Sequence, residues 1–143
     1  MMDMTTSPVT NVLQPLQRDV QRLLGRCLLR LQQYERLMKA IVAHHEISGP
    51  AHSLEAIRAA RIDDAATKTL GTLVGQLFGS YVVTDGNGGE ERDDDLPGDV
   101  LSFRTRVQLR LSAQDYAKTQ ADLKDLVSLR NTLVHHFIDQ HDL

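Results

Sequence analysis

The residues best suited to chemistry lie near the C-terminus, where Arg130, Asn131 and His135 fall within one short segment. Arginine binds phosphate groups, an amide can orient them, and an imidazole transfers protons near neutral pH. Asn131 and His135 are four residues apart, so on a helix their side chains are neighbours. These residue types at this spacing predict a phosphate-binding site that can move a proton, and RNA cleavage is a reaction that they would suit.

We expect this set to lie on one long helix from Ala113 to about Gln140, because the segment contains no Pro or Gly. Ser112 is a suitable N-cap, and Asp115 three residues later approximates a capping box. On an α-helical wheel, Arg130 falls in the middle of the apolar arc and about 140° from His135. One copy of the helix would therefore have difficulty surrounding a phosphate, and a site built from two copies is part of the prediction.

Arg130 also has a purely structural interpretation. A charge in an apolar arc is costly unless it is paired or reaches a cleft. A buried ion pair with Glu35 or Glu46 would satisfy it, and the protein would then be a plain helical interaction protein. If Arg130 instead binds phosphate, Glu35 and the exposed His136 are candidate accessory residues.

The first helix is predicted from its apolar spacing. Residues 1–10 are polar and contain a proline, so we expect a flexible tail there. One helix should then run from about Asn11 to His45 and end at Ser48-Gly49-Pro50. Cys27, the only cysteine, lies on its apolar stripe and is expected to be a small core residue. The stripe recurs at an average step of 3.5, the spacing of a helix seam, at Leu13, Leu16, Val20, Leu23, Cys27, Leu31, Tyr34, Met38 and Ile41.

The middle of the chain predicts two further helices. Ser53–Ala60 could form a short one, and Ala65–Ser80 is the stronger candidate. The second carries Gly71, Gly75 and Gly79 at four-residue intervals. Because glycine costs about 1 kcal/mol relative to alanine inside a helix, we expect one shared reason for them. That reason is the close approach of another helix backbone, within the fold or across a dimer.

An acidic loop and an alternating segment follow. Residues 84–98 are rich in Gly, Asp and Glu and do not fit a calcium-loop template, so we expect a solvated, mobile loop. Residues 101–111 alternate between apolar and polar side chains, which predicts a half-buried strand, with a helix as the alternative. Residues 81–84 could pair with it as a hairpin. Three arginines would share the outer face, either as a solvated surface or as a phosphate-contacting patch: Arg104, Arg106 and Arg110.

Composition limits the classes of protein. The formal net charge of −3 argues against gripping long nucleic acids by bulk charge, but it allows a small basic cleft. Aromatic residues make up only 4% of the chain, which suits a core of packed helices. No secretory signal and no long apolar run is present, so we expect a soluble, cytoplasmic protein without membrane contact. Zinc-ligand spacing is absent, and we expect neither a metal nor a cofactor.

The Arg130-Asn131 pair followed by His135 resembles the motif of the HEPN superfamily, in which Arg and His are separated by four to six residues. Leu129, the Thr132–Val134 segment and the late position in the chain are also similar to that family. The resemblance implies a mainly α fold, an up-down bundle of long antiparallel helices, with a possible small β-hairpin insertion around 81–110. It also implies a single domain over 11–143.

The resemblance further implies a metal-independent endoribonuclease that acts as a homodimer with a composite site. Arg130 would bind the scissile phosphate, His135 would act as general base or acid, and Asn131 would orient either of them. The alternative is a catalytically weak or inactive accessory module for dimerisation or RNA binding in a larger RNA-related or defence protein. The ribonuclease would belong to a toxin–antitoxin, phage-defence or RNA-processing setting, with an antitoxin as a candidate partner. The accessory module would instead have a fused RNA-binding domain as its partner. Some members carry a modified Tyr where this chain has Phe137, so that control is not expected.

Overall fold

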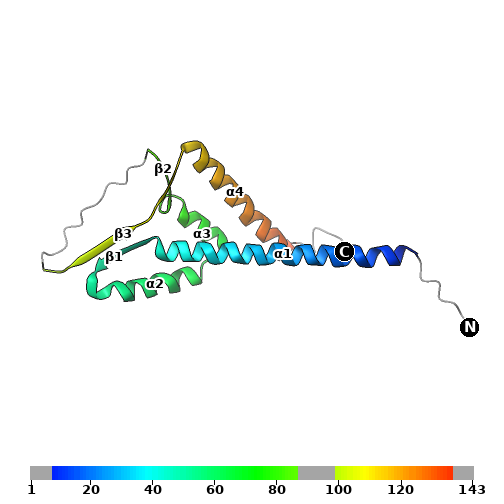
Figure 1. Cartoon of the computed structure of the whole chain (residues 1–143), viewed down its shortest axis with the longest axis horizontal. Helices are drawn as coiled ribbons and strands as arrows, with labels where there is room; N and C mark the ends of the chain where they lie inside the picture. The colour runs from blue at the N-terminus through cyan, green and yellow to red at the C-terminus, as the bar shows by residue number, and fades with distance from the viewer. Residues whose placement is uncertain (1–7, 87–98, 137–143) are drawn as a thin grey trace, which may run out of the picture. The chain divides into compact units, whose positions relative to one another are not determined.

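The computed structural model describes residues 8–86 and 99–136, and helices dominate these ranges (Figure 1). The α-helices are α1 (Pro8–His44), α2 (Leu54–Ala66), α3 (Leu70–Leu77) and α4 (Ala113–Asn131). A 3₁₀ turn, η1 (Ala51–Ser53), precedes α2, and a π-helical turn, η2 (Thr132–His136), follows α4. The strands are β1 (Glu46–Pro50), β2 (Val82–Thr84), β3 (Ser102–Arg106) and β4 (Leu109–Leu111). The predicted mainly helical class, with a small strand component, is confirmed.

The chain divides into two compact units, Met1–Gln33 and Tyr34–Leu143. In the first unit the structure describes the N-terminal part of α1, and the second unit holds the other elements. Helix α1 ends within one residue of its predicted end and begins three residues earlier than predicted. Cys27 is exposed, so its prediction as a core residue is wrong. The apolar spacing located the stripe correctly but could not show whether another element covers it.

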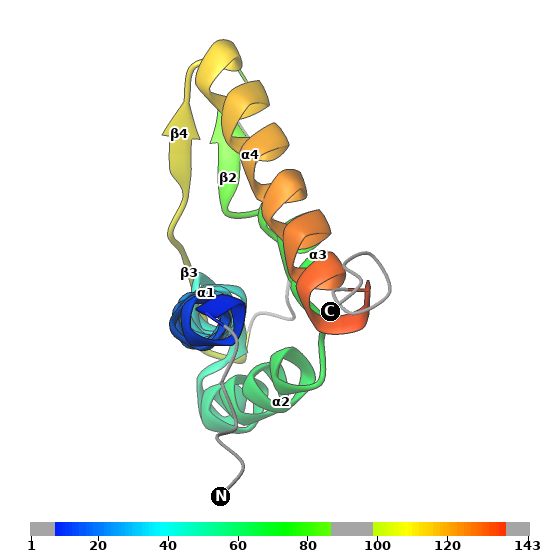
Figure 2. The ribbon, with the colours of Figure 1, turned by 90° about the vertical axis from the view of Figure 1, so that its right-hand side faces the viewer.

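The core of the second unit is built around α3. This helix has apolar side chains at the i, i+3, i+4 and i+7 spacing of a one-sided amphipathic helix. Leu70 and Leu73 are 1% and 0% exposed, respectively. Val127 of α4 packs partly buried against this cluster, and Figure 2 shows α3 beside the lower half of α4. The remaining buried members come from α1, α2 and α3: Met38, Val42, Ala43, Ala65, Val74 and Leu77.

The segment predicted as one helix over 65–80 is divided between two. Its first two residues complete α2, which is longer than predicted, and α3 begins at Leu70. Thr69 is the N-cap of α3, because its side-chain oxygen accepts a hydrogen bond from the Thr72 amide at 3.4 Å. Helix α3 ends at Leu77, and Gly79 follows with a φ of +88°. Threonine and glycine therefore set the two ends.

The predicted hairpin between residues 81–84 and 101–111 is wrong. β2 pairs with β4 in parallel, and Figure 2 shows the two side by side. β3 pairs instead with β1 in an antiparallel ladder, in a region where the sequence indicated only a helix-ending turn. Between β3 and β4, the Val107 amide donates to the His45 carbonyl at 2.7 Å. Period-two alternation identifies strands, but it does not choose their partners. Of the acidic loop, only residues 84–86 lie among those that the structure describes.

The three evenly spaced glycines have three different environments. A Cβ added at Gly71 would lie 3.4 Å from Val127 Cγ1, which fits the predicted approach of another helix. A Cβ at Gly75 would meet nothing within 4 Å. Gly79 lies outside α3, in the left-handed region that favours glycine. The shared explanation predicted from the sequence therefore holds for Gly71 alone.

None of the helices in the described ranges combines the length and the apolar character needed to cross a lipid bilayer.

Candidate functional site

The site residues lie at the C-terminal end of α4. The helix begins as predicted, because Ser112 Oγ accepts a hydrogen bond from the Asp115 amide at 3.1 Å and donates one to Asp115 Oδ2 at 2.8 Å. Its end differs from the prediction. After Asn131 the backbone changes from α-helical to π-helical over η2. The remainder of the predicted helix, from Phe137 onward, lies outside the described residues.

The π-helical turn is associated with a close approach of Arg130 and His135. Arg130 Nη1 lies 3.5 Å from His135 Nε2 and 3.3 Å from Asn131 Oδ1. On a regular α-helix, residues five apart diverge by about 140°. In π-helical geometry the hydrogen bonds join residues five apart, which draws such pairs onto one side. The divergence expected from the helical wheel does not apply, and one chain brings the guanidinium and the imidazole together.

Arg130 does not form either of the ion pairs that its structural interpretation required. Glu35 pairs with Lys39 at 3.0 Å, and Glu46 pairs with Arg106 at 2.6 Å. Within the described part of the chain, the side-chain hydrogen bonds of Arg130 go to Asn131 and His135 only. Its charge therefore has no carboxylate partner there. Arg130 is half-buried, while the other two residues are exposed. An anion can approach the cluster from solvent.

The His135 and His136 rings contact each other, and His135 also lies close to the Arg130 guanidinium. Because the Arg130 guanidinium can only donate, a hydrogen bond to it makes His135 Nε2 the acceptor, and the lone pair of this nitrogen then points to Arg130. The His135 and His136 rings meet edge to face, with centroids 6.3 Å apart. Both side chains are exposed. This arrangement provides an anion-binding cation next to a nitrogen that can accept a proton.

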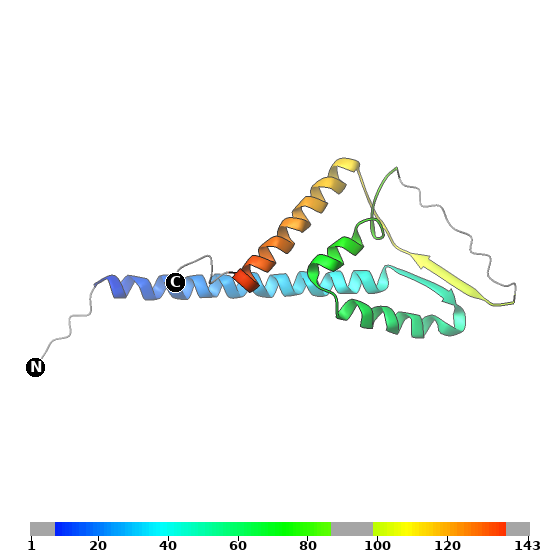
Figure 3. The same ribbon diagram turned by 180° about the vertical axis from the view of Figure 1, so that it is seen from behind.

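The three arginines predicted as a phosphate-contacting patch lie on two strands that precede α4, Arg104 and Arg106 on β3 and Arg110 on β4. Arg106 forms its ion pair with the cross-strand Glu46, and Arg104 Nε donates to Ser48 Oγ at 3.3 Å. Arg110 lies on β4, just before α4 begins. At 1.5 Å per residue, the 17-residue interval from Ala113 to Arg130 spans about 25 Å. Figures 1 and 3 show the chain passing from β3 to the start of α4, and the helix running away from that point. One chain therefore does not bring Arg110 close to Arg130.

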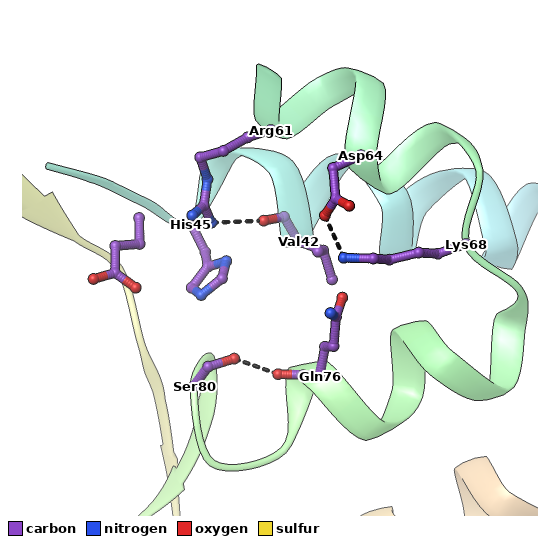
Figure 4. Close-up of a pocket in the computed structure, with 8 residues that line it drawn as sticks. Val42, His45, Arg61, Asp64, Lys68, Gln76 and Ser80 are labelled. Carbon is purple, nitrogen blue, oxygen red and sulfur yellow. Dashed lines mark hydrogen bonds and ion pairs between the residues drawn. The ribbon is translucent and has the colours of Figure 1, made fainter. Parts of the chain in front are cut away.

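A polar pocket of 280 Å³ lies elsewhere in the second unit, between the end of α1, α2 and the region of α3 (Figure 4). Arg61 lines it and donates to the carbonyl oxygens of Val42 and Ala43 at 2.9 and 3.1 Å, which caps the C-terminal end of α1. Lys68 forms an ion pair with Asp64. Arg61 therefore holds α2 against the end of α1, and Lys68 is neutralised by a neighbour four residues away.

His45 also lines this pocket and was not singled out from the sequence. It is 9% exposed, its Nδ1 donates to the Ile41 carbonyl at 3.0 Å, and its ring meets Tyr81 edge to face. Its Nε2 has no hydrogen-bond partner and less than 1 Å² of exposed surface. A molecule in the pocket therefore cannot reach this nitrogen in the observed conformation. His45 continues the buried spacing of Met38 and Val42, and this was the signal that could have placed it in the interior.

Within the ranges that the structure describes, no group of three His, Cys, Asp or Glu side chains could hold a metal ion. Comparison with known proteins found no matching family model, no matching curated protein and no matching solved structure.

Proposed function

We propose that this protein is a metal-independent endoribonuclease of the HEPN type that acts as a dimer. The observation that carries the proposal is the 3.5 Å approach of Arg130 Nη1 to His135 Nε2, on an exposed helix end, without a carboxylate partner for the guanidinium among the described residues. A solvent-accessible guanidinium beside an imidazole suits phosphodiester chemistry, because His135 Nε2 can accept a proton once the guanidinium turns to bind the phosphate. The resemblance of Arg130, Asn131 and His135 to the family motif supports the same assignment.

The reaction that fits these groups is internal transesterification of RNA. The ribose 2′-oxygen attacks the adjacent phosphorus while its proton passes to His135 Nε2. The bond from phosphorus to the 5′-oxygen breaks, and the leaving oxygen takes a proton from an acid. Arg130 donates hydrogen bonds to the non-bridging oxygens, whose negative charge grows in the transition state. Asn131 Oδ1, 3.3 Å from Arg130 Nη1, orients the guanidinium. The products carry a 2′,3′-cyclic phosphate and a 5′-hydroxyl.

A dimer supplies the second proton-transfer group. One imidazole cannot accept the 2′ proton and protonate the leaving oxygen at the same moment, unless it shuttles a single proton between them. In a two-copy site, His135 of the partner subunit is the acid while His135 of the first is the base. His136 is the alternative acid within one chain, since its ring meets that of His135. Either arrangement acts without a metal.

The test is cleavage of single-stranded and structured RNA by the full chain in EDTA. We expect Arg130→Ala and His135→Ala each to lower the rate by about a hundredfold or more. Arg58→Ala and His52→Ala are matched controls, because both residues are exposed and lie on α2 and η1, and they should leave the rate unchanged. The products should end in a 2′,3′-cyclic phosphate.

Three outcomes would count against this proposal. Equal cleavage by the wild type, Arg130→Ala and His135→Ala would remove these residues from the reaction. Cleavage that requires a divalent cation would exclude the metal-independent mechanism. RNA binding that Arg130→Ala weakens, without cleavage by the wild type, would favour the accessory RNA-binding module instead.

A further inference from the structure

The N-terminal part of α1 carries a stripe of exposed apolar side chains. Four of its side chains are about half exposed or more: Leu13 58%, Leu16 57%, Val20 47% and Leu23 54%. Cys27, the next residue of the stripe, is also exposed. Large aliphatic side chains in a continuous exposed row are unfavourable in water. Such a row indicates a surface that another molecule covers.

The spacing of the stripe specifies the kind of partner. The steps from Leu13 to Cys27 alternate between three and four residues, which is the a/d seam of a two-stranded coiled coil. A seam of this kind packs against a second helix with the same spacing. The stripe can meet that requirement with another copy of itself. The flanking positions, which lie beside the seam in a coiled coil, decide the direction and register of such a pair.

We propose that two copies of this chain pair through this stripe as an antiparallel coiled coil. Leu16 packs against Cys27 of the partner subunit, and Val20 packs against Leu23 of the partner subunit. In this register Asp19, at one flanking g position, faces Arg26 of the partner subunit at another. The two-fold symmetry of the dimer forms this ion pair twice. The surface is thus complementary to itself in charge as well as in shape.

Other arrangements of the same two helices are less favourable. A parallel pair places Asp19 opposite the apolar Leu24 of the partner subunit, so the opposite charges do not meet. Shifting the antiparallel register by one heptad in either direction sets Asp19 or Arg26 against its own copy. Opposite charges meet only in the proposed register.

Both charged residues are available for this pairing. Asp19 contacts Arg22 of its own helix at 3.4 Å, but the two side chains are 64% and 59% exposed, and such a pair contributes little. Arg26 is exposed and forms no ion pair within the described part of the chain. Association would therefore give Arg26 an ion pair with Asp19 of the partner subunit, and Asp19 would remain close to a cation.

The first test measures mass by light scattering over a range of concentrations. The full chain should have about twice its 16.0 kDa mass, and Val20→Asp should give the monomer with unchanged helical content. Leu29→Asp is the matched control, because Leu29 is 62% exposed but lies outside the seam. Asp19→Arg should weaken association about tenfold, because two attractive pairs become repulsive. The double variant Asp19→Arg/Arg26→Asp should restore it.

The second test uses Cys27, the only cysteine, to read the direction of the helices. In the proposed dimer the two copies of Cys27 are 11 residues apart along the seam, or about 16 Å, which is too far for a disulfide. Mild oxidation should leave the wild type without a cross-link. It should cross-link the Leu16→Cys variant between subunits, and Arg18→Cys, on the outer face, should not cross-link. A parallel dimer would instead link Cys27 to its own copy in the wild type.

Each outcome bears on the proposal. A monomeric wild type at high concentration, or a dimer that Val20→Asp leaves intact, overturns it. A disulfide-linked wild type overturns the antiparallel arrangement. The proposed ribonuclease site would use a dimer, but this inference rests on α1 residues alone. Its tests read mass and cross-linking rather than cleavage, so either proposal can fail without the other.

Discussion

Replacing the three evenly spaced glycines by alanine, one at a time, should change stability in different directions. Gly75 lies inside α3, and a Cβ there would meet nothing within 4 Å. It lines a pocket of 170 Å³ between α3 and α4, so the added methyl group has room. Alanine is favoured over glycine in a helix interior by about 1 kcal/mol. Gly75→Ala should therefore stabilise the protein by about 1 kcal/mol.

Gly79→Ala should have the opposite effect. The φ of +88° costs a residue with a Cβ about 1–2 kcal/mol. Alanine also lowers the conformational entropy of the unfolded chain, which stabilises the folded state by about 0.4–1 kcal/mol. The net effect is a loss of about 1 kcal/mol. Gly71→Ala should lie within about 0.5 kcal/mol of the wild type, because the 3.4 Å contact with Val127 Cγ1 offsets the gain in helix propensity.

The assay is equilibrium urea unfolding followed by circular dichroism, at one fixed protein concentration because association would contribute to stability. The expected spread between Gly75→Ala and Gly79→Ala is about 2 kcal/mol, or roughly 8 °C in Tm. Similar destabilisation by all three substitutions would refute the reasoning. It would mean that the glycines form one contact stripe against a helix, as the sequence alone predicted.

Two further perturbations test the core and the β1–β3 ladder. Leu73→Ala should lower the free energy of unfolding in urea by about 3 kcal/mol, because this side chain is 0% exposed. Leu101→Ala is the control, since Leu101 is 80% exposed, and it should change stability by less than about 0.5 kcal/mol. Burial alone would raise the pKa of Glu46, but the hydrogen bond and charge of Arg106 outweigh it and hold that pKa below its usual value. A carboxyl with a lowered pKa stabilises the fold above its unfolded pKa and loses that contribution as the pH falls through its folded pKa. Glu46→Gln should therefore be less stable than the wild type at about pH 7 and equal to it at about pH 2; a constant difference at both pH values would contradict this.

Much of the helical architecture was predictable because its signals are local. The 3.5-residue spacing placed α1, and the Ser112 cap with Asp115 placed the start of α4. Such signals act between residues within about four positions of each other. The division between α2 and α3 was missed because the helical propensity of this segment gave no sign of the turn that ends at Thr69.

The candidate site was predictable in its residue types but not in its geometry. Arg130, Asn131 and His135 can be read from the sequence, and an α-helical wheel separates the first from the third. The structure joins them through a π-helical turn, and no residue type specifies such a turn by itself. The environment of Arg130 also depends on distant residues, since both of its predicted carboxylate partners pair with other cations.

By itself the sequence determined the residue set of the site, the long first helix and the presence of strands after the acidic loop. Only the tertiary structure decided which strands pair, that Cys27 is exposed and His45 buried, and that the three glycines have separate roles. The physical reason is the range of the interactions. Helix periodicity and capping depend on near neighbours along the chain, whereas strand pairing and burial depend on which distant segments pack together.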